Sequence, residues 1–276
     1  LAMLKRHPDS VERVVLASAE GLDQTVKLPA RTDAFLKRLS AKIAAHPVAG
    51  KRFPDLFATM KRVFARVGRE RPLVSFTGPG GKEMQVRIGP YDLQLATAYL
   101  IKNPETLPML AEAFARLDDG DYGAAAPHVA RLRSALRLNA MSIAMDDASG
   151  ISPERRKKVE RQRSTSLLSD ALNFPFPALF GASGVPDLGP DFRSPVKTDV
   201  PALFLTGTLD GRTYPEGHRE IMQGFSRPVH VVIEDAGHDL FMSTPGVHDV
   251  IAAFLEGRPV TRTRLAAPPV RWEASD

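Results

Sequence analysis

The sequence predicts an α/β fold in which parts of one parallel sheet lie on either side of a large helical insertion. Three short apolar runs, at residues 14–16, 202–205 and 229–233, are the observations behind this prediction. Each run is too short for a helix and lacks the alternation of a half-exposed strand, so each is typical of a strand buried on both faces. We expect these runs to form neighbouring parallel strands.

The first part of the chain predicts one helix and one strand. Leu1 and Leu4 belong to a helix that ends before Pro8, because proline disfavours the helical conformation in the residue preceding it. The run at 14–16 is the strand, and Glu20 follows at its end. Ligands bind at the carboxyl edge of a parallel sheet, so Glu20 is a candidate site residue.

From about residue 31 to residue 195 helical spacing replaces the buried runs. Apolar side chains recur every three or four positions, which predicts several amphipathic helices. Strict alternation on both sides of the Gly-rich turn at 78–81 instead predicts a β-hairpin. Ser152 and Pro153 are a typical helix start, with serine as the cap and proline in the first turn.

The second part of the sheet lies within residues 200–239. Asp210 follows the run at 202–205, and His238 follows the run at 229–233. Pro215 begins the helix that connects the two strands. Because parallel strands joined by a helix end at the same edge of a sheet, Asp210 and His238 should emerge side by side.

A carboxylate beside an imidazole has a well-defined catalytic use. The carboxylate fixes the tautomer of the histidine and stabilises its protonated form, and the histidine then acts as the base for a nucleophile. Asp210 and His238 are therefore the predicted catalytic acid and base.

The acid-then-histidine order and three stretches resemble the α/β-hydrolase superfamily, and within it the proline-iminopeptidase and tripeptidyl-aminopeptidase branch. The stretches are LAMLKRHPDSVERVVLASAEG, PALFLTGTLDGRTYP and EDAGHD. The resemblance covers residues 1–29 and 196–256 and is only architectural between them. It implies the C-terminal part of an α/β-hydrolase sheet, interrupted by a helical cap.

The resemblance also implies a division of the chain. Residues 1–29 would supply the helix after the nucleophile elbow and the sixth strand, and residues 30–195 the cap with its hairpin. Residues 196–257 would supply the seventh and eighth strands with the acid and histidine loops. Residues 258–276 lack periodicity and are rich in proline, so we expect an extended tail packed on the surface through Trp272.

One element of the superfamily is missing: the chain contains no G-x-S-x-G elbow. The nearest serine context, at residues 181–184, has the wrong spacing. We expect the nucleophile, with the first five strands, to precede Leu1. The 276 residues alone should then be aggregation-prone and inert to a fluorophosphonate probe.

The activity implied is serine-type hydrolysis of a small peptide with a free N-terminus. Asp146 and Asp147, at the end of an apolar stretch, are candidates to pair with the substrate amine, as cap carboxylates do in the aminopeptidase branch; alternatively they cap the turn at 147–150. Glu20 is a further candidate for substrate binding and the rival of Asp210 as the acid. The GTLDGRTYP context favours Asp210.

Three other functions stay open: an esterase, a hydrolase with an aspartate nucleophile such as a dehalogenase or epoxide hydrolase, and a non-catalytic relative that binds ligands under its cap. The basic run at 155–158 has two interpretations, a binding patch for phosphate or membrane and a solvated helix face. The pattern favours the solvated face.

Composition excludes other classes of function. The chain has no cysteine, which excludes disulfides, thiol nucleophiles and cysteine-bound metals. Its net charge of +5, with acids interspersed, does not favour nucleic-acid binding. No stretch of eighteen apolar residues predicts a membrane span. No metal or organic cofactor is expected, and the sequence leaves compartment and oligomeric state open.

Overall fold

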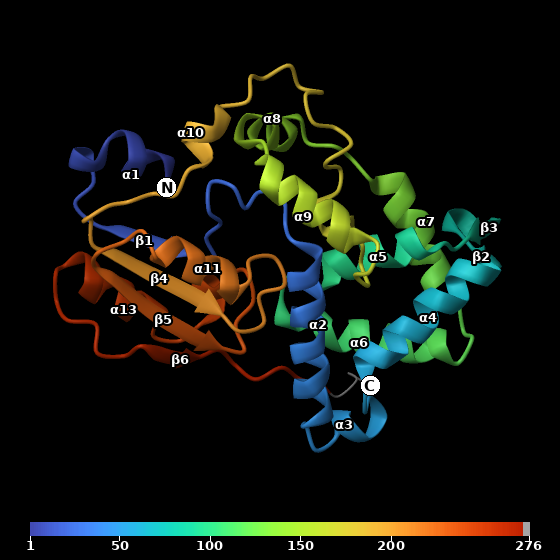
Figure 1. Ribbon diagram of the computed structural model, residues 1–276. Coiled ribbons are helices and arrows are strands. Elements are labelled where there is room, and N and C mark those ends of the chain that lie inside the picture. Colours follow the sequence, from blue (N-terminus) through green and yellow to red (C-terminus); the bar gives the residue numbers. More distant parts are fainter. Residues whose placement is uncertain (273–276) are drawn as a thin grey trace.

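The structure, a computed structural model, describes residues 1–272 and places a sheet beside a helical region (Figure 1). The sheet consists of parallel strands in the order β1-β4-β5-β6, so the α/β fold class predicted from the sequence is confirmed. Its strands are β1 (Val14–Ala17), β4 (Ala202–Gly207), β5 (Pro228–Glu234) and β6 (Arg264–Ala266).

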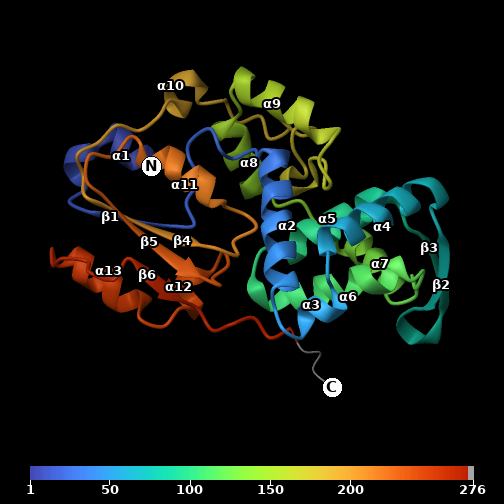
Figure 2. The same cartoon turned by 60° about the horizontal axis from the view of Figure 1, so that its bottom comes forward.

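β4 is a central strand with two buried faces. Leu203 and Leu205 pack on one face with Val231 of β5, whereas Ala202 and Phe204 pack on the other. The views in Figures 1 and 2 place α1 and α11 over one face of the sheet and α13 under the other. The helices flanking the sheet are α1 (Ala2–Arg6), α11 (Pro215–Met222), α12 (Leu240–Ser243) and α13 (Val247–Leu255).

β1 is only half-buried, which corrects the expectation of a strand buried on both faces. The reason is its position at the edge of the sheet. It pairs with β4 alone, in the register Val14↔Ala202, and no strand in residues 1–272 covers its other side.

The helical region contains the alternating hairpin and a core of its own. β2 and β3 pair antiparallel, with Val74 opposite Val86, as the alternation predicts. Phe35 of α2, Met60 of α4 and Phe114 of α6 belong to one buried cluster. The elements are α2 (Pro29–Ala44), α3 (Ala49–Arg52), α4 (Leu56–Glu70), β2 (Leu73–Thr77), β3 (Glu83–Arg87), α5 (Pro90–Leu100), α6 (Leu107–Asp118), α7 (Ala125–Ala135), α8 (Ala140–Ser149), α9 (Pro153–Arg163) and α10 (Gly189–Arg193).

Short 3-10 turns complete the described chain: η1 (Pro8–Ser10), η2 (Pro79–Gly81), η3 (Pro104–Thr106) and η4 (Ala171–Asn173). At the start of α9 the Ser152 hydroxyl accepts a hydrogen bond from the Arg155 amide, so the predicted cap is present. No helix within residues 1–272 is both long and apolar enough to cross a bilayer.

The C-terminal segment corrects a second expectation, because it is not simply a surface tail. Residues 264–266 form β6, with Leu265 opposite Ile233 of β5. The outer edge of β5 offers unpaired backbone groups, and a strand as short as β6 satisfies several of them. Trp272, by contrast, packs as expected: it is 8% exposed and belongs to the buried cluster of the helical region. Residues 273–276 lie outside the described part.

Candidate active site

The structure brings Asp210 and His238 into contact at the carboxyl edge of the sheet. Asp210 lies in the loop after β4, and His238 lies in the loop after β5. Since β4 and β5 are parallel neighbours, the two loops leave the sheet side by side. Nδ1 of His238 is 3.1 Å from Oδ2 of Asp210, a hydrogen-bond distance.

Asp210 is buried and has a donor for each oxygen. Its Oδ1 accepts hydrogen bonds from the amides of Arg212, at 2.8 Å, and Thr213, at 2.9 Å. Its Oδ2 accepts from the Thr213 hydroxyl as well as from His238. Burial by itself raises the pKa of this carboxyl, but the hydrogen bond and charge of His238 and the Thr213 donors outweigh burial, and the pKa lies below its ordinary value. Asp210 is therefore an ionised carboxylate.

His238 is oriented on one side and open on the other. Its side chain is 30% exposed, compared with 1% for Asp210. Nδ1 faces Asp210, with the Thr213 hydroxyl at 3.5 Å. Within residues 1–272 no side chain forms a hydrogen bond with Nε2. This arrangement leaves one ring nitrogen able to exchange a proton with an external group.

Glu20 does not contact His238 and is paired with another residue. Its carboxylate lies 2.6 Å from Nζ of Lys27. Of the two acids that the sequence offers as partners of the histidine, the structure brings Asp210 alone to the imidazole.

Asp147 is hydrogen-bonded to a distant turn of the helical region. Its side chain is buried and accepts hydrogen bonds from the amides of Gly181, at 2.8 Å, and Ser183, at 2.9 Å, and from the Ser183 hydroxyl. These bonds, the Ser183 ones first, lower the pKa of Asp147. Asp147 therefore holds the turn at 181–184, a contact across the helical region that no local pattern indicates.

Asp146 lies closer to the acid loop. It is half-buried, and burial raises its pKa. The charge of Glu20 raises this pKa further, whereas the charges of Lys27 and Arg212 lower it. Arg212 belongs to the loop that holds Asp210, so the polar region beside this loop contains Arg212 and Glu20, and the Asp146 carboxyl lies within reach of their charges. A cavity of about 20 Å³ lies in this region and has room for about one water molecule. Its lining includes Glu20, Lys27, Arg155, Arg212 and Thr213.

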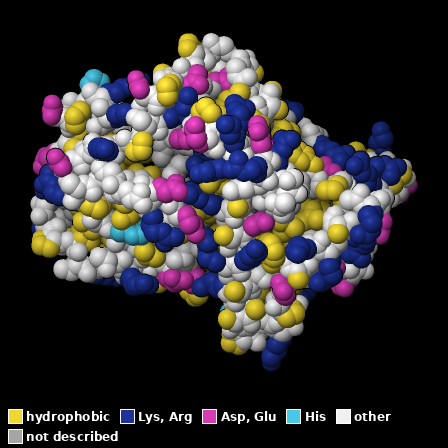
Figure 3. Space-filling model, in the orientation of Figure 1, with side chains coloured by type: hydrophobic (Ala, Val, Ile, Leu, Met, Phe, Trp, Pro, Cys, Tyr) yellow, Lys and Arg dark blue, Asp and Glu magenta, His cyan; other side chains and the backbone are white. Residues whose placement is uncertain are grey.

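The basic run on α9 is not wholly a solvated face, which corrects the preferred interpretation for one residue. The Arg155 side chain points inward, where Nε donates to the carbonyl of Val26 at 2.6 Å, and burial lowers its pKa. Arg156 lies over the ring of Phe180. Residues 157 and 158 are exposed, as expected of a solvated face. Figure 3 shows Lys and Arg interspersed with Asp and Glu on one face of the molecule.

Two histidines to which the sequence assigns no function share one threonine hydroxyl between β4 and its neighbours. The Thr206 hydroxyl is 2.6 Å from Nδ1 of His218 and 2.9 Å from Nε2 of His230. His218 is fully buried, and burial lowers its pKa to about 4, so this imidazole is neutral. The sequence contains no signal for this contact, because the two histidines lie on different elements, one on a helix and one in a strand.

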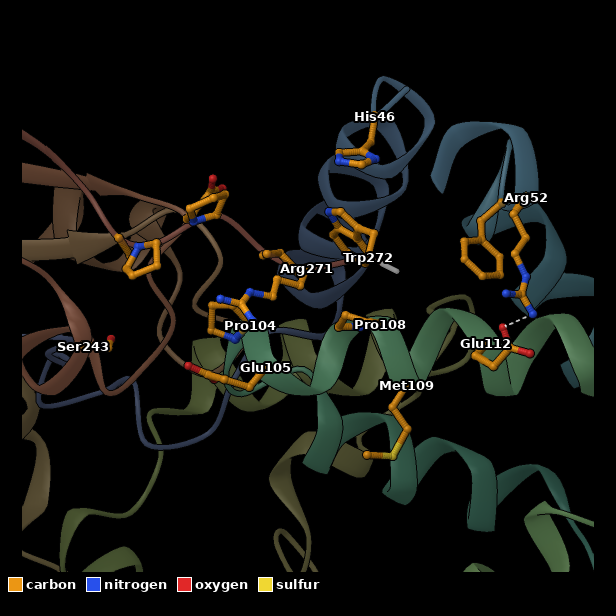
Figure 4. A pocket seen from close by; sticks show the side chains of 16 residues that line it. His46, Arg52, Pro104, Glu105, Pro108, Met109, Glu112, Ser243, Arg271 and Trp272 are labelled. Carbon is orange, nitrogen blue, oxygen red and sulfur yellow. Dashed lines mark ion pairs between the residues drawn. The ribbon is translucent and has the colours of Figure 1, made fainter. Parts of the chain in front are cut away.

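A cavity with a volume of about 1080 Å³ lies elsewhere (Figure 4). Neither Asp210 nor His238 lines it. Its walls come from α3, the start of α6 and the C-terminal segment, and Figure 4 shows the ion pair between Arg52 and Glu112 at one end. Within residues 1–272 no group of three or more acidic or histidine side chains is arranged to hold a metal ion.

Comparison with known families agrees with the geometry of the two loops. Residues 184–263 match the model of a family described as TAP-like protein, and the matched segment contains both Asp210 and His238. The match supports an α/β-hydrolase. With the parallel sheet and its helical insertion, the match also supports hydrolase activity in general terms. No curated protein matches the chain.

Proposed function

We propose that this protein is an α/β-hydrolase of the serine type, a peptidase that cleaves substrates with a free N-terminus. The observation behind the proposal is the orientation of His238. Asp210 engages Nδ1 at 3.1 Å, and Nε2 remains available to a nucleophile. Asp210 and His238 have the relation of acid and base in a catalytic triad.

The nucleophile in this proposal is a serine on a G-x-S-x-G turn outside the 276 residues, because the chain contains no such turn. The serine oxygen attacks the scissile carbonyl carbon while Nε2 of His238 takes its proton. The imidazolium then protonates the leaving amine as the carbon–nitrogen bond breaks. In the second half of the reaction, Nε2 takes a proton from water as the water oxygen attacks the acyl carbon, and returns that proton to the serine oxygen as the ester bond breaks. In this proposal backbone amides outside this chain hold the oxyanion.

Substrate selection in this proposal rests on Asp146 and Glu20. Both are half-buried carboxylates in the polar region beside the acid loop. Burial disfavours the charged form of Asp146, and a substrate ammonium would restore it by forming a charge-assisted hydrogen bond. The helical region at 30–195 would act as the cap over this pocket, as the family resemblance implies.

The test compares an aminoacyl chromogenic substrate with its N-acetylated twin, in the protein that also carries the nucleophile. Acetylation removes the positive charge, so we expect kcat/KM to fall about 10-fold or more. Asp146→Asn should reduce this difference, whereas Glu160→Gln, which changes an exposed acid of α9, should leave it unchanged.

Each contrary result identifies another function. Equal rates on the two substrates would exclude the aminopeptidase assignment, and a preferred short-chain ester would make the protein an esterase. Turnover without labelling by a fluorophosphonate would indicate an aspartate nucleophile. Binding without any turnover would make it a ligand-binding relative.

A further inference from the structure

A segment of the helical region lies directly against both catalytic loops. This segment, residues 101–104, consists of the connection after α5 and the first residue of η3, and the Lys102 carbonyl accepts a hydrogen bond from the His238 amide at 3.1 Å. A Cβ added to Gly237 would lie 2.5 Å from Cδ of Pro104, and one added to Gly211 would lie 2.1 Å from the carbonyl oxygen of Ile101. Glycine is therefore required in both loops, because the segment approaches their backbones so closely.

Both backbone polar groups of His238 form hydrogen bonds. Its amide bonds to Lys102, and its carbonyl accepts a hydrogen bond at 2.9 Å from the hydroxyl of Ser18, just after β1. The two contacts come from opposite parts of the fold, the helical region and the sheet edge. They fix the position from which the imidazole reaches Asp210.

Asn103 secures the residue after His238 through two hydrogen bonds. Its Nδ2 donates to Oδ2 of Asp239 at 2.7 Å, and its Oδ1 accepts from the Asp239 amide at 3.2 Å. The bond from Asn103 is the largest of the effects that lower the pKa of Asp239. Nζ of Lys102 adds an ion pair to the same carboxylate at 3.1 Å, between side chains that are 44% and 48% exposed. An exposed pair contributes little, so the amide of Asn103 provides the specific geometry.

We propose that Asn103 is a positioning residue for His238, acting through Asp239 and the backbone of the histidine loop. The expected effect on turnover rests on the proposed function. The positioning of the histidine loop by Asn103 does not depend on that function. An asparagine has a donor and an acceptor in one planar group. Its donor serves the carboxylate of Asp239, and its acceptor serves the backbone amide of Asp239. Without this contact the loop can shift relative to Asp210, and small displacements of a catalytic group are costly.

The experiment uses three changes in the protein that also carries the nucleophile: Asn103→Ala, Asn103→Asp, and Asn103→Asp combined with Asp239→Asn. The single changes should lower kcat about 10-fold while KM stays within about twofold, because the loss falls on the chemical step. The double change exchanges donor and acceptor between the two side chains, so it should recover most of the lost kcat. Gln94→Ala is the matched control, since Gln94 is also an amide that donates to a backbone carbonyl, that of Leu167, without contacting the histidine loop.

The second measurement does not depend on turnover. The hydrogen bond between Nδ1 of His238 and Asp210 is expected to give a low-field NMR resonance. The single changes should weaken or broaden it, the double change should restore it, and Gln94→Ala should leave it intact. If the protein hydrolyses nothing but the resonance follows this pattern, the positioning role stands and the proposed function fails. If Asn103→Asp leaves both kcat and the resonance unchanged, or if the double change restores neither, the positioning role is wrong.

Discussion

On the proposed function, replacement of Asp210 by asparagine is expected to lower turnover on the order of 10⁴-fold, by analogy with the serine-protease triad. The amides of Arg212 and Thr213 both donate to Oδ1 of Asp210, so the oxygen of an asparagine would remain there. Its NH₂ group would then face Nδ1 of His238 and require an acceptor. The imidazole would place its proton on Nε2, where it can no longer accept one from a nucleophile.

Kinetics with an aminoacyl chromogenic substrate measure this loss, and thermal unfolding shows whether the fold is retained. Asp199→Asn is a matched control, because Asp199 is also a hydrogen-bonded aspartate, held by the Ser226 hydroxyl at 2.6 Å, but precedes β4 rather than following it. It should alter turnover little. A far greater loss for Glu20→Gln than for Asp210→Asn would reverse the assignment of the acid.

The buried His218 should make the protein less stable in mild acid. Its pKa is lowered by burial to about 4 in the folded protein, against an ordinary value of 6.5. Between these pH values the unfolded chain binds a proton that the folded protein excludes, so stability is full above pH 6.5 and falls as the pH drops toward about 4. The loss should amount to roughly 3 kcal/mol. His230, whose pKa is also lowered, acts in the same direction.

Urea unfolding at a series of pH values measures the effect as the change in the free energy of unfolding. In His218→Gln most of the loss between neutral pH and pH 4 should disappear, because glutamine does not titrate. His248→Gln, which alters an exposed histidine of α13, should retain the wild-type dependence. Asp210, with its lowered pKa, contributes to acid sensitivity only below its ordinary value of 3.8, so it does not account for a loss at higher pH. The same slope in wild type and His218→Gln would contradict the assignment.

The adjacency of Asp210 and His238 could be predicted because it depends on local signals alone. Two short apolar runs with a helix between them specify parallel neighbours, and the polar residue after each run then falls at one edge. The hairpin is also a local signal, since its alternation and its glycines lie within a few residues. Family resemblance added roles to these positions but was not needed to place them side by side.

The remaining features depend on contacts between distant residues. β6 is too short to show a periodicity, and it forms because β5 offers an unpaired edge. The sequence around Asp147 is compatible with several hydrogen-bond partners. Packing decides that the partner is the turn at 181–184. The contact between Lys102 and His238 joins two loops that have no pattern in common.

The pairing of β1 with β4 has a consequence for how the chain folds as it is synthesised. Val14 pairs with Ala202, so the entire helical region must leave the ribosome before β1 gains a partner among residues 1–272. The helices and the hairpin are built largely from neighbouring segments and can form early, whereas closing the loop between β1 and β4 is slow. Until then β1 exposes an unpaired edge, so a nascent chain paused before β4 is the species on which chaperones would act.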